Sequence, residues 1–419
     1  MQPKILLTDT NRWPVPARLA LAFARKGCRV AALCPCPGHP VQSVGAVERV
    51  FHYDGFNPIG SLRHAIEAFG PDIVIASCDR GVQHLHTLYA TAVREGASGR
   101  AIAALIEHSF GAPESFSIVS SRYELLQVAH REGILTPETI PVTGVADLER
   151  WSAKAALPWV LKADGTWGGR GVRVAHTVKA AQRSFGELTR RPGAFDLAKG
   201  LLLNRDRGWV VLAWKNSRSA VIAQSLINGR PANCAVVCWK GEVLAGIGVE
   251  VLRAKGAKGP ATLVEVVDSP PMIEAASRIA SKLKLSGFFG LDFMIETGTG
   301  ATYLIEMNPR CTPPCPLPLG KGRDLVAAMW AQLSGEPLPE SEPVTPNPRI
   351  AYFPGANGRT VAVCDANPTL PSYEDIPREE PALVEELLHP WSGRSLLGQM
   401  VDYARNSWTD EGPPEHYPA

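Results

Sequence analysis

Asp292, Glu306 and Asn308 carry oxygen atoms that can bind a metal ion, and all three lie in one short stretch of the sequence. Glu306 and Asn308 are two positions apart, so on a strand they point to the same face. Apolar runs on both sides of the glycine-rich turn 296–300 predict a β-hairpin that brings Asp292 opposite this pair. Two carboxylates and a carboxamide form the oxygen-only site that Mg²⁺ prefers. Acidic residues that simply face water near a turn would give the same pattern, so the hairpin alone does not decide.

Residues 159–174 are a second stretch whose residue types could bind a ligand. Lys162 lies in an apolar strand-like run, and a glycine-rich loop and a second strand-like run follow it; the loop glycines are Gly165, Gly168, Gly169 and Gly171. Such a turn can lay backbone N–H groups against phosphate oxygens, and a lysine adds a point charge. The loop lacks the Gly-Lys-Ser/Thr ending of a Walker A motif, and no helix follows the glycines as in a dinucleotide site. Together with the hairpin, the loop predicts a nucleotide-phosphate and magnesium site.

With these two motifs, residues 122–335 resemble the ATP-grasp superfamily of ATP-dependent carboxylate ligases. The resemblance implies ATP and Mg²⁺ as cofactors, with Mn²⁺ as an alternative ion, and it makes Asp292, Glu306 and Asn308 the metal ligands. It implies that Lys162 and the glycine loop bind phosphate, and that Arg310, just after the asparagine, contacts an acyl phosphate. It also implies a hinge that binds adenine through backbone groups, here Gln224, Ser225, Leu226 and Ile227.

The sequence departs from the family pattern at three places. Arg122, at the start of an expected helix, replaces the usual nucleotide-binding lysine. Residues 229–233 (Gly-Arg-Pro-Ala-Asn) stand where many members carry a ribose-binding acid, so the ribose contact falls to Asn233 or to water. Asp292 stands where glutamate or glutamine is often found, and the shorter side chain still fits a metal.

Other polar residues near these motifs have less specific patterns. Arg253, Lys255 and Lys258 form a basic loop before the hairpin; we expect Arg253 to contact the γ-phosphate or the incoming substrate, with a solvated loop as the alternative. Cys311 and Cys315 follow Arg310, and they either line the substrate end of the site or are small residues in a proline-rich turn.

The first 110 residues alternate apolar strand-like runs with helical segments, which predicts a Rossmann-like parallel sheet. The loop after the first strand has no glycine, so a dinucleotide site is not expected there. Ligands of open α/β sheets bind beyond the carboxyl ends of the strands. This rule places a substrate cleft near Thr8, Asp9, Asn11, Asp79, Arg80 and His84. Arg80 would hold a carboxylate there or form a loop salt bridge.

Composition sets the broad class of the protein. The 419 residues carry a formal net charge of +2, and 45% of them are hydrophobic. This balance favours an ordinary globular chain of several domains and gives no basic surface for nucleic acid or membranes. No apolar run reaches the length of a membrane span, and we identify no signal peptide. The nine scattered cysteines indicate reduced thiols and a cytoplasmic protein.

We therefore expect an α/β protein with a Rossmann-like domain (1–111), a first ATP-grasp subdomain with a glycine-rich lid (112–223) and a second with the metal hairpin (224–335). A proline-rich C-terminal extension (336–419) follows. The expected activity is ATP-dependent activation of a small-molecule carboxylate as an acyl phosphate, followed by coupling to an amine. A thioester-forming ligase and a non-catalytic nucleotide-binding protein are the alternatives. The substrates and the oligomeric state, with a homodimer among the options, are not readable from the sequence.

Overall fold

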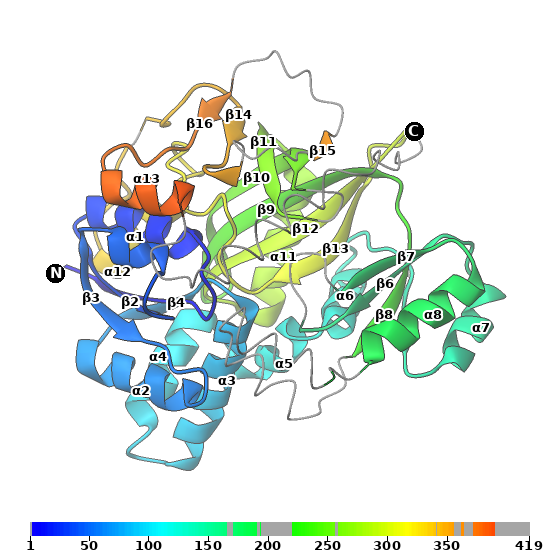
Figure 1. Cartoon of the computed structure of the whole chain (residues 1–419), viewed down its shortest axis with the longest axis horizontal. Coiled ribbons are helices and arrows are strands. Elements are labelled where there is room, and N and C mark those ends of the chain that lie inside the picture. Colours follow the sequence, from blue (N-terminus) through cyan, green and yellow to red (C-terminus); the bar gives the residue numbers. More distant parts are fainter. Residues whose placement is uncertain are drawn as a thin grey trace.

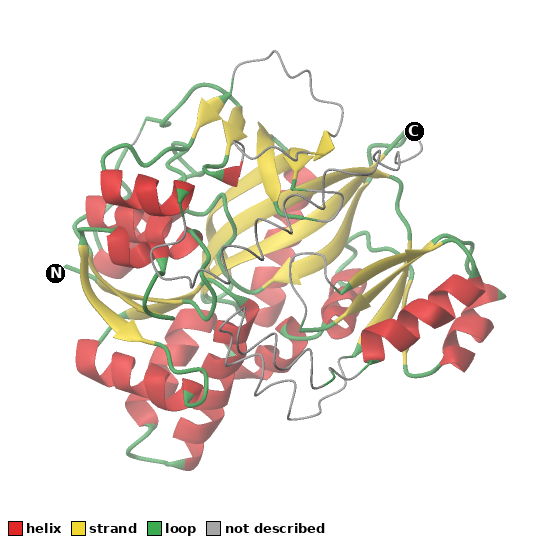
Figure 2. Ribbon diagram, in the orientation of Figure 1, coloured by secondary structure: helices red, strands yellow, loops and turns green. Residues whose placement is uncertain are grey.

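A computed structural model of the chain (Figure 1) describes residues 2–165, 171–190, 193, 220–255, 259–340, 342–355, 362–363 and 372–389. Within these residues the strands form three sheets, and helices cover them (Figure 2). The N-terminal sheet lies on the left of Figure 1, the largest sheet in the centre, and the small sheet with α7 and α8 on the right.

The N-terminal sheet is parallel and has the strand order β3-β2-β1-β4, which confirms the predicted Rossmann-like domain. Its elements are β1 (Lys4–Thr8), α1 (Val15–Arg25), β2 (Arg29–Cys34), η1 (Pro40–Ser43), β3 (Val47–His52), α2 (Pro58–Phe69), β4 (Ile73–Ala76), α3 (Asp79–Arg94) and α4 (Arg100–Phe110). Ile5 and Leu7 pack on the side of α1, and Leu6 packs on the side of α2, α3 and α4. β1, β2 and β4 are mainly apolar because both faces of the sheet are covered there, whereas the edge strand β3 is largely exposed.

The small sheet is antiparallel, with the order β5-β8-β6-β7. Its elements are β5 (Thr139–Val142), α7 (Val145–Ser152), β6 (Trp159–Ala163), β7 (Val172–Ala175), α8 (Val178–Thr189) and β8 (Val221–Ser225). It has its own core, in which Trp151 and Trp159 pack together with ring centroids 4.5 Å apart. Lys162 therefore lies on β6, just before the glycine loop, as the sequence predicts.

The central sheet follows the order β13-β12-β9-β10-β11-β14-β16, and β15 pairs with β10. Its elements are β9 (Gly229–Trp239), β10 (Glu242–Ala254), β11 (Ala261–Val267), α11 (Pro270–Leu283), β12 (Gly287–Glu296), β13 (Thr302–Asn308), α12 (Leu325–Ser334), β14 (Arg349–Ala351), β15 (Ala362–Val363) and β16 (Tyr373–Glu374). Alternate residues of β9 face two cores. Cys234 and Val236 pack in the core that contains α11, and Ala235 and Val237 pack in the core that contains α12 and α1.

The boundaries of these sheets differ from the expected ranges. η2 (Pro113–Ser115), α5 (Phe116–Val119) and α6 (Arg122–Arg131) precede the small sheet in the chain, yet Leu125 and Val128 of α6 pack with α11 against the central sheet. The expected boundary between 223 and 224 falls inside β8, and the chain crosses to the central sheet at 226–228. The apolar face of α6 is buried against the central sheet, although α6 comes just before the small sheet in the sequence.

The C-terminal extension is part of this architecture rather than a separate unit. β14 pairs with β11 and β16 pairs with β14, so both strands widen the central sheet. α13 (Pro381–Leu388) lies against α1 in Figure 1, where Asp375 forms an ion pair with Arg18. The strand-like run from 349 and the helical run from 382 in the sequence form β14 and α13, and the helical run 395–405 lies outside the described residues. The extension thus joins the N-terminal domain to the central sheet.

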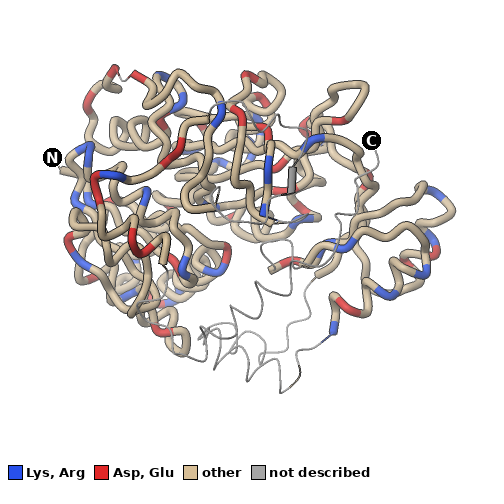
Figure 3. The backbone as a smooth tube through the Cα atoms, turned by 45° about the horizontal axis from the view of Figure 1, so that its top comes forward, with Lys and Arg blue, Asp and Glu red and all other residues tan. Residues whose placement is uncertain are grey.

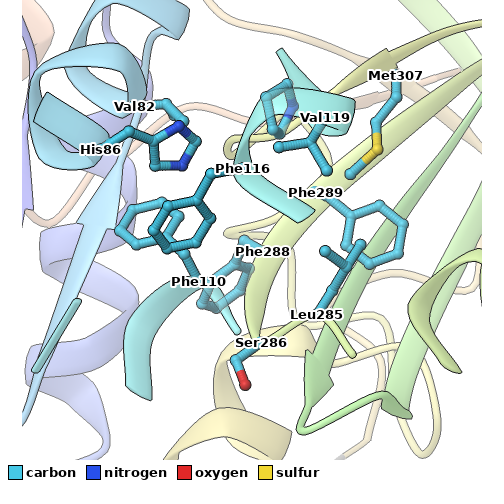
Figure 4. A pocket seen from close by; sticks show the side chains of 11 residues that line it. Val82, His86, Phe110, Phe116, Val119, Leu285, Ser286, Phe288, Phe289 and Met307 are labelled. Carbon is cyan, nitrogen blue, oxygen red and sulfur yellow. The ribbon is translucent and has the colours of Figure 1, made fainter. Parts of the chain in front are cut away.

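A small apolar cavity of about 20 Å³ lies between α3, α5 and the start of β12 (Figure 4). His86 and Phe116 stack beside it with ring centroids 4.0 Å apart, and Phe289 and Met307 close the other side. Burial lowers the pKa of His86 to about 4. The cavity has room for about one water molecule and is therefore no nucleotide site. His108 lies in the last turn of α4 and contacts the ring of Trp239.

None of the described helices is both long and apolar enough to cross a bilayer. Basic and acidic residues are interspersed over the described chain (Figure 3). This distribution agrees with the small net charge of the sequence.

Candidate active site

The hairpin β12–β13 brings the predicted metal ligands together. Asp292 and Glu306 are direct partners in the antiparallel register, and Asn308 is the partner of Gly290 on the same face. The register shifts after Asp292, because Phe293 pairs with Leu304 and leaves Ile305 as an extra residue on β13. This β-bulge turns Glu306 toward Asp292, as bulges near functional sites often re-aim a side chain.

Two amide groups hold the carboxylate of Asp292. Asn233 Nδ2 on β9 donates to its Oδ1 at 2.7 Å, and Asn308 Nδ2 donates to its Oδ2 at 2.9 Å. Burial raises the pKa of Asp292, and the negative charge of Glu306 raises it further. Neutral amides orient this carboxylate without adding a positive charge at hydrogen-bond distance.

Basic side chains surround Glu306. Arg122 donates from one guanidinium nitrogen to Glu306 Oε1 at 2.6 Å and from another to Asp164 Oδ1 at 3.1 Å. Lys162 Nζ donates to the carbonyl of the bulged Ile305 at 3.2 Å. Burial by itself would raise the pKa of Glu306, but the charges of Arg122 and Lys162 lower it. Burial also lowers the pKa of Lys162 against the opposing effect of Glu306.

The donor set fits a hard divalent cation. Asp292, Glu306 and Asn308 supply only oxygen ligands, from one face of adjacent strands. In the part of the chain that is described, no three His, Cys, Asp or Glu residues form a metal cluster, so a cation here depends on the amide of Asn308 and on phosphate or water oxygens. The guanidinium of Arg122 already neutralises Glu306, and a cation would share that carboxylate with it.

Arg310 connects the hairpin to the N-terminal domain. Its Nε donates to Asp79 Oδ1 at 3.1 Å and one terminal nitrogen donates to Asn308 Oδ1 at 3.0 Å. Asp79 begins α3, directly beyond the carboxyl end of β4, and Cys311 N donates to Ala76 O at 3.2 Å. The carboxyl edge of the parallel sheet therefore lies beside the hairpin, where the sequence placed a substrate cleft.

Asp9 is at the same edge but is fully buried. Its carboxylate accepts hydrogen bonds from His39 Nε2 at 3.1 Å and from the backbone of Asn11 and Trp13. Burial alone would raise the pKa of Asp9, but the hydrogen bond from His39 helps to lower it. His39 Nδ1 accepts from Val41 N, so this ring is held as a donor to Asp9 and serves the loop structure.

The sequence did not reveal the residues that contact and support the predicted metal ligands. Asn233 was expected near the ribose, but its side chain binds Asp292 and Leu291 O instead. Thr312 Oγ1 donates to Asn233 Oδ1 at 3.5 Å. A Cβ at position 290 would lie 2.5 Å from Thr312 Cγ2 and 3.3 Å from Asn233 Nδ2, so Gly290 allows this close approach. A glycine two residues before the metal aspartate was the available signal.

The remaining predicted residues are placed less completely. Gly165 has a φ of +72° at the start of the glycine loop, and Gly171 O accepts from Ala163 N at its end. Gly168 and Gly169 lie outside the described residues, as does Lys258. Arg253 lies near the end of β10, four residues beyond the partner of Asn233, and its buried Nε has no hydrogen-bond partner among the described residues.

The structure narrows the predictions for the hinge and for the two cysteines. The N–H groups of Ser225 and Leu226 donate to the carbonyls of residues 138 and 158, so they are not available to adenine. The buried side chain of Gln224 donates to Thr139 Oγ1 at 3.3 Å. Cys311 and Cys315 are fully buried in the core with α1 and α12, so the reading as small residues in a proline-rich turn is the one that fits.

The comparison with protein-family models agrees with the resemblance that the sequence motifs show. The family model described as "ATP-grasp domain" matches residues 206–314. A search of curated proteins finds no significant match.

Several solved structures share the fold at low sequence identity. Biotin carboxylase from Campylobacter jejuni is 14% identical with a TM-score of 0.58, and the match covers 81% of this chain and 72% of that one. N5-carboxyaminoimidazole synthetase from Staphylococcus aureus, complexed with ADP, is 14% identical with a TM-score of 0.55 and coverage of 81% and 80%. L-amino acid ligase from Bacillus licheniformis is 16% identical with a TM-score of 0.54 and coverage of 82% and 78%. The chain therefore shares its fold with these structures, and its residues 206–314 match the ATP-grasp domain model.

Proposed function

We propose that the protein is an ATP-dependent ligase that activates a small-molecule carboxylate and couples it to an amine, with release of ADP and phosphate. The observation that carries the proposal is the convergence at the hairpin of two partly buried carboxylates with three basic side chains. Asp292 and Glu306 face each other, and Lys162, Arg122 and Arg310 contact the hairpin within hydrogen-bond distance. Phosphoryl transfer depends mainly on such positioned charge rather than on acid–base residues.

In this proposal Asp292, Glu306 and Asn308 hold Mg²⁺, or Mn²⁺ in its place. The bound ion would neutralise charge on the phosphate oxygens of ATP. Lys162 Nζ would bind the transferring end of the nucleotide, since an ammonium has three donors and the bond to Ile305 O uses one. Lys162 lies on β6 just before the glycine loop, so closing that loop would bring more donors to the same phosphates and exclude water.

The reaction would proceed in two steps. A carboxylate oxygen of the substrate attacks the γ-phosphorus of ATP, which forms an acyl phosphate and ADP. The amine nitrogen then attacks the acyl carbon, loses a proton and displaces inorganic phosphate. Arg310 would orient the carboxylate and stabilise the oxyanion, because Asp79 and Asn308 fix its planar guanidinium.

The hydrogen bonds of the hinge narrow the way in which adenine would be bound. Ser225 and Leu226 have used their N–H groups, so we assign adenine binding to the N–H of Ile227 and to hinge carbonyls. The organic substrates would bind at the carboxyl edge of the N-terminal sheet. There Thr8 Oγ1 and Ser77 Oγ are buried without hydrogen-bond partners among the described residues. Buried hydroxyls of this kind are costly unless a ligand or water completes them.

The test is ADP formation with Mg²⁺ or Mn²⁺ across a set of amino acids and other small carboxylic acids, with hydroxylamine added to trap an acyl phosphate as a hydroxamate. We expect a hydroxamate that depends on one acid and that disappears in Glu306→Gln. Glu296→Gln is the matched control, since Glu296 lies at the turn of the same hairpin and its carboxylate accepts a hydrogen bond only from Thr299 among the described residues. It should keep activity.

Other products would reject parts of the proposal. AMP and pyrophosphate in place of ADP would contradict the acyl-phosphate route. A coenzyme A thioester formed in preference to an amide would identify the thiol alternative. Tight ATP binding without turnover would instead indicate a nucleotide-binding regulatory protein.

A further inference from the structure

Cys34 and Cys36 form a thiol pair at the carboxyl end of β2, apart from the metal hairpin. Their sulfur atoms are 3.9 Å apart, and Cys36 Sγ also contacts Cys34 O at 3.4 Å. Cys34 is buried, whereas Cys36 is half-buried; every other described cysteine is buried. One sulfur is therefore accessible to a reagent, and a second lies directly behind it.

The charges around the two sulfurs differ. Cys36 has the rings of His52 and His39 nearby, and His52 hydrogen-bonds to it. Cys34 is the register partner of His52 across β3, and it also lies near Asp9 and Arg12. The hydrogen bond from Cys34, together with His52, lowers the pKa of Cys36 to about 6 against the effect of burial. The same contact raises the pKa of Cys34. Cys36 is therefore the stronger acid of the pair and its nucleophile.

The other cysteines lack this arrangement. Burial raises the pKa of Cys28 and of Cys78 to about 12, so both are unreactive thiols. Cys311 and Cys315 also lie close together, but both are fully buried, where a small reagent has no access.

We propose that Cys34 and Cys36 are a redox-active dithiol that reacts with small-molecule disulfides. The Cys36 thiolate attacks one sulfur of the disulfide, which forms a mixed disulfide and releases one thiolate. Cys34 loses its proton and attacks Cys36 Sγ, which releases the second thiolate and forms the Cys34–Cys36 disulfide. Two protein thiols are oxidised, and one disulfide is reduced to two thiols.

Formation of the bond would move the loop rather than the strand. The sulfur atoms must approach from 3.9 Å to about 2.05 Å, and Cys34 is fixed in β2. The loop after Cys36 carries Pro37, whose carbonyl accepts from Arg12 at 2.7 Å, and His39, which donates to Asp9. Oxidation would therefore change the contacts that this loop makes with Arg12 and Asp9 at the polar edge of the N-terminal sheet.

The experiment exposes the full-length protein to mixtures of reduced and oxidised glutathione, quenches it with acid and maps disulfides in a non-reduced digest. We expect a Cys34–Cys36 disulfide in the wild type and a stable glutathione adduct on Cys36 in Cys34→Ala. We expect no modification at this site in Cys36→Ser. Cys28→Ser is the control and should behave as the wild type does.

A second measurement does not depend on the variants. The rate of alkylation of Cys36 by iodoacetamide should rise with a midpoint near pH 6, well below that of an ordinary thiol. Alkylation with an ordinary thiol midpoint, or a pair that remains reduced while other cysteines are glutathionylated, would overturn the proposal.

Discussion

Replacing Arg122 by methionine should reveal how the site balances its charge. The guanidinium contacts Glu306 at 2.6 Å, and the two side chains are 14% and 20% exposed. Removing one partner of a buried ion pair costs about 3–5 kcal/mol, since the other charge remains without compensation. Lys162 stays close to Glu306, so we expect a loss of about 3 kcal/mol in the free energy of unfolding, at the lower end of that range.

Mg²⁺ should reduce this loss. In the wild type a cation would share Glu306 with the guanidinium, whereas in Arg122→Met it would replace the positive charge that the guanidinium supplied, with Lys162 and Arg310 still nearby. Urea unfolding followed by tryptophan fluorescence, with and without MgCl₂, measures both effects. We expect Mg²⁺ to stabilise Arg122→Met more than the wild type.

Arg150→Met is the matched control, because Arg150 pairs with Asp147 on the surface of α7 and is 71% exposed. A surface pair of this kind contributes about 0.5 kcal/mol or less. If Arg122→Met loses no more stability than Arg150→Met, or if Mg²⁺ stabilises both variants equally, the charge argument for the site is wrong.

The same pair predicts a pH dependence. The folded protein lowers the pKa of Glu306 below its ordinary value of 4.5, so the stabilisation is present above pH 4.5 and is lost as the pH falls through the folded pKa. The difference in stability between the wild type and Arg122→Met should therefore shrink in acid. A difference that stays constant to pH 3 would contradict this reasoning.

Four further predictions follow from single contacts. Lys162→Met should lower kcat by about 10²-fold or more, measured as ADP release, because a positioned charge on the transferring phosphate is lost. Asp79→Asn should raise the KM for the carboxylate about tenfold, or about 1.4 kcal/mol, while KM for ATP stays unchanged, because it frees Arg310. Gly290→Ala should weaken Mn²⁺ binding measured by electron paramagnetic resonance, since its Cβ would collide with a neighbouring threonine. His86 has a folded pKa of about 4 against 6.5 unfolded, so the unfolded chain binds the proton first and stability falls by about 3 kcal/mol from pH 6.5 to 4. His86→Phe should remove this part of the slope in pH-dependent unfolding.

The hairpin and the strand before the glycine loop could be predicted from the sequence, because strand alternation and glycine turns depend on neighbouring residues alone. The alternation of β12 and β13 around a glycine turn predicts their pairing, and two-residue spacing predicts that Glu306 and Asn308 share a face. The strand–helix alternation of the first 110 residues predicts a parallel sheet, and the structure confirms it. The same rules predict Lys162 on a strand before the glycine loop.

Contacts between distant segments were not readable. Arg122 and Glu306 are 184 positions apart, and Asp79 and Arg310 are 231 apart. Periodicity shows which face of an element is apolar, but it does not show which polar ends meet when two sheets pack. The ribose contact was therefore assigned to Asn233 or to water, whereas the Asn233 side chain holds Asp292 in the structure.

The sequence by itself determined the types of chemical group and the strands that carry them, because hydrophobic alternation and glycine turns act over a few residues. Only the tertiary structure decided which charges compensate one another. The bulge at Ile305, the guanidinium of Arg122 on Glu306 and the contact of Asp79 with Arg310 arise from packing of the central sheet against α6 and against the N-terminal domain. Packing of whole apolar faces fixes these positions, and side chains far apart in the chain then meet as its consequence.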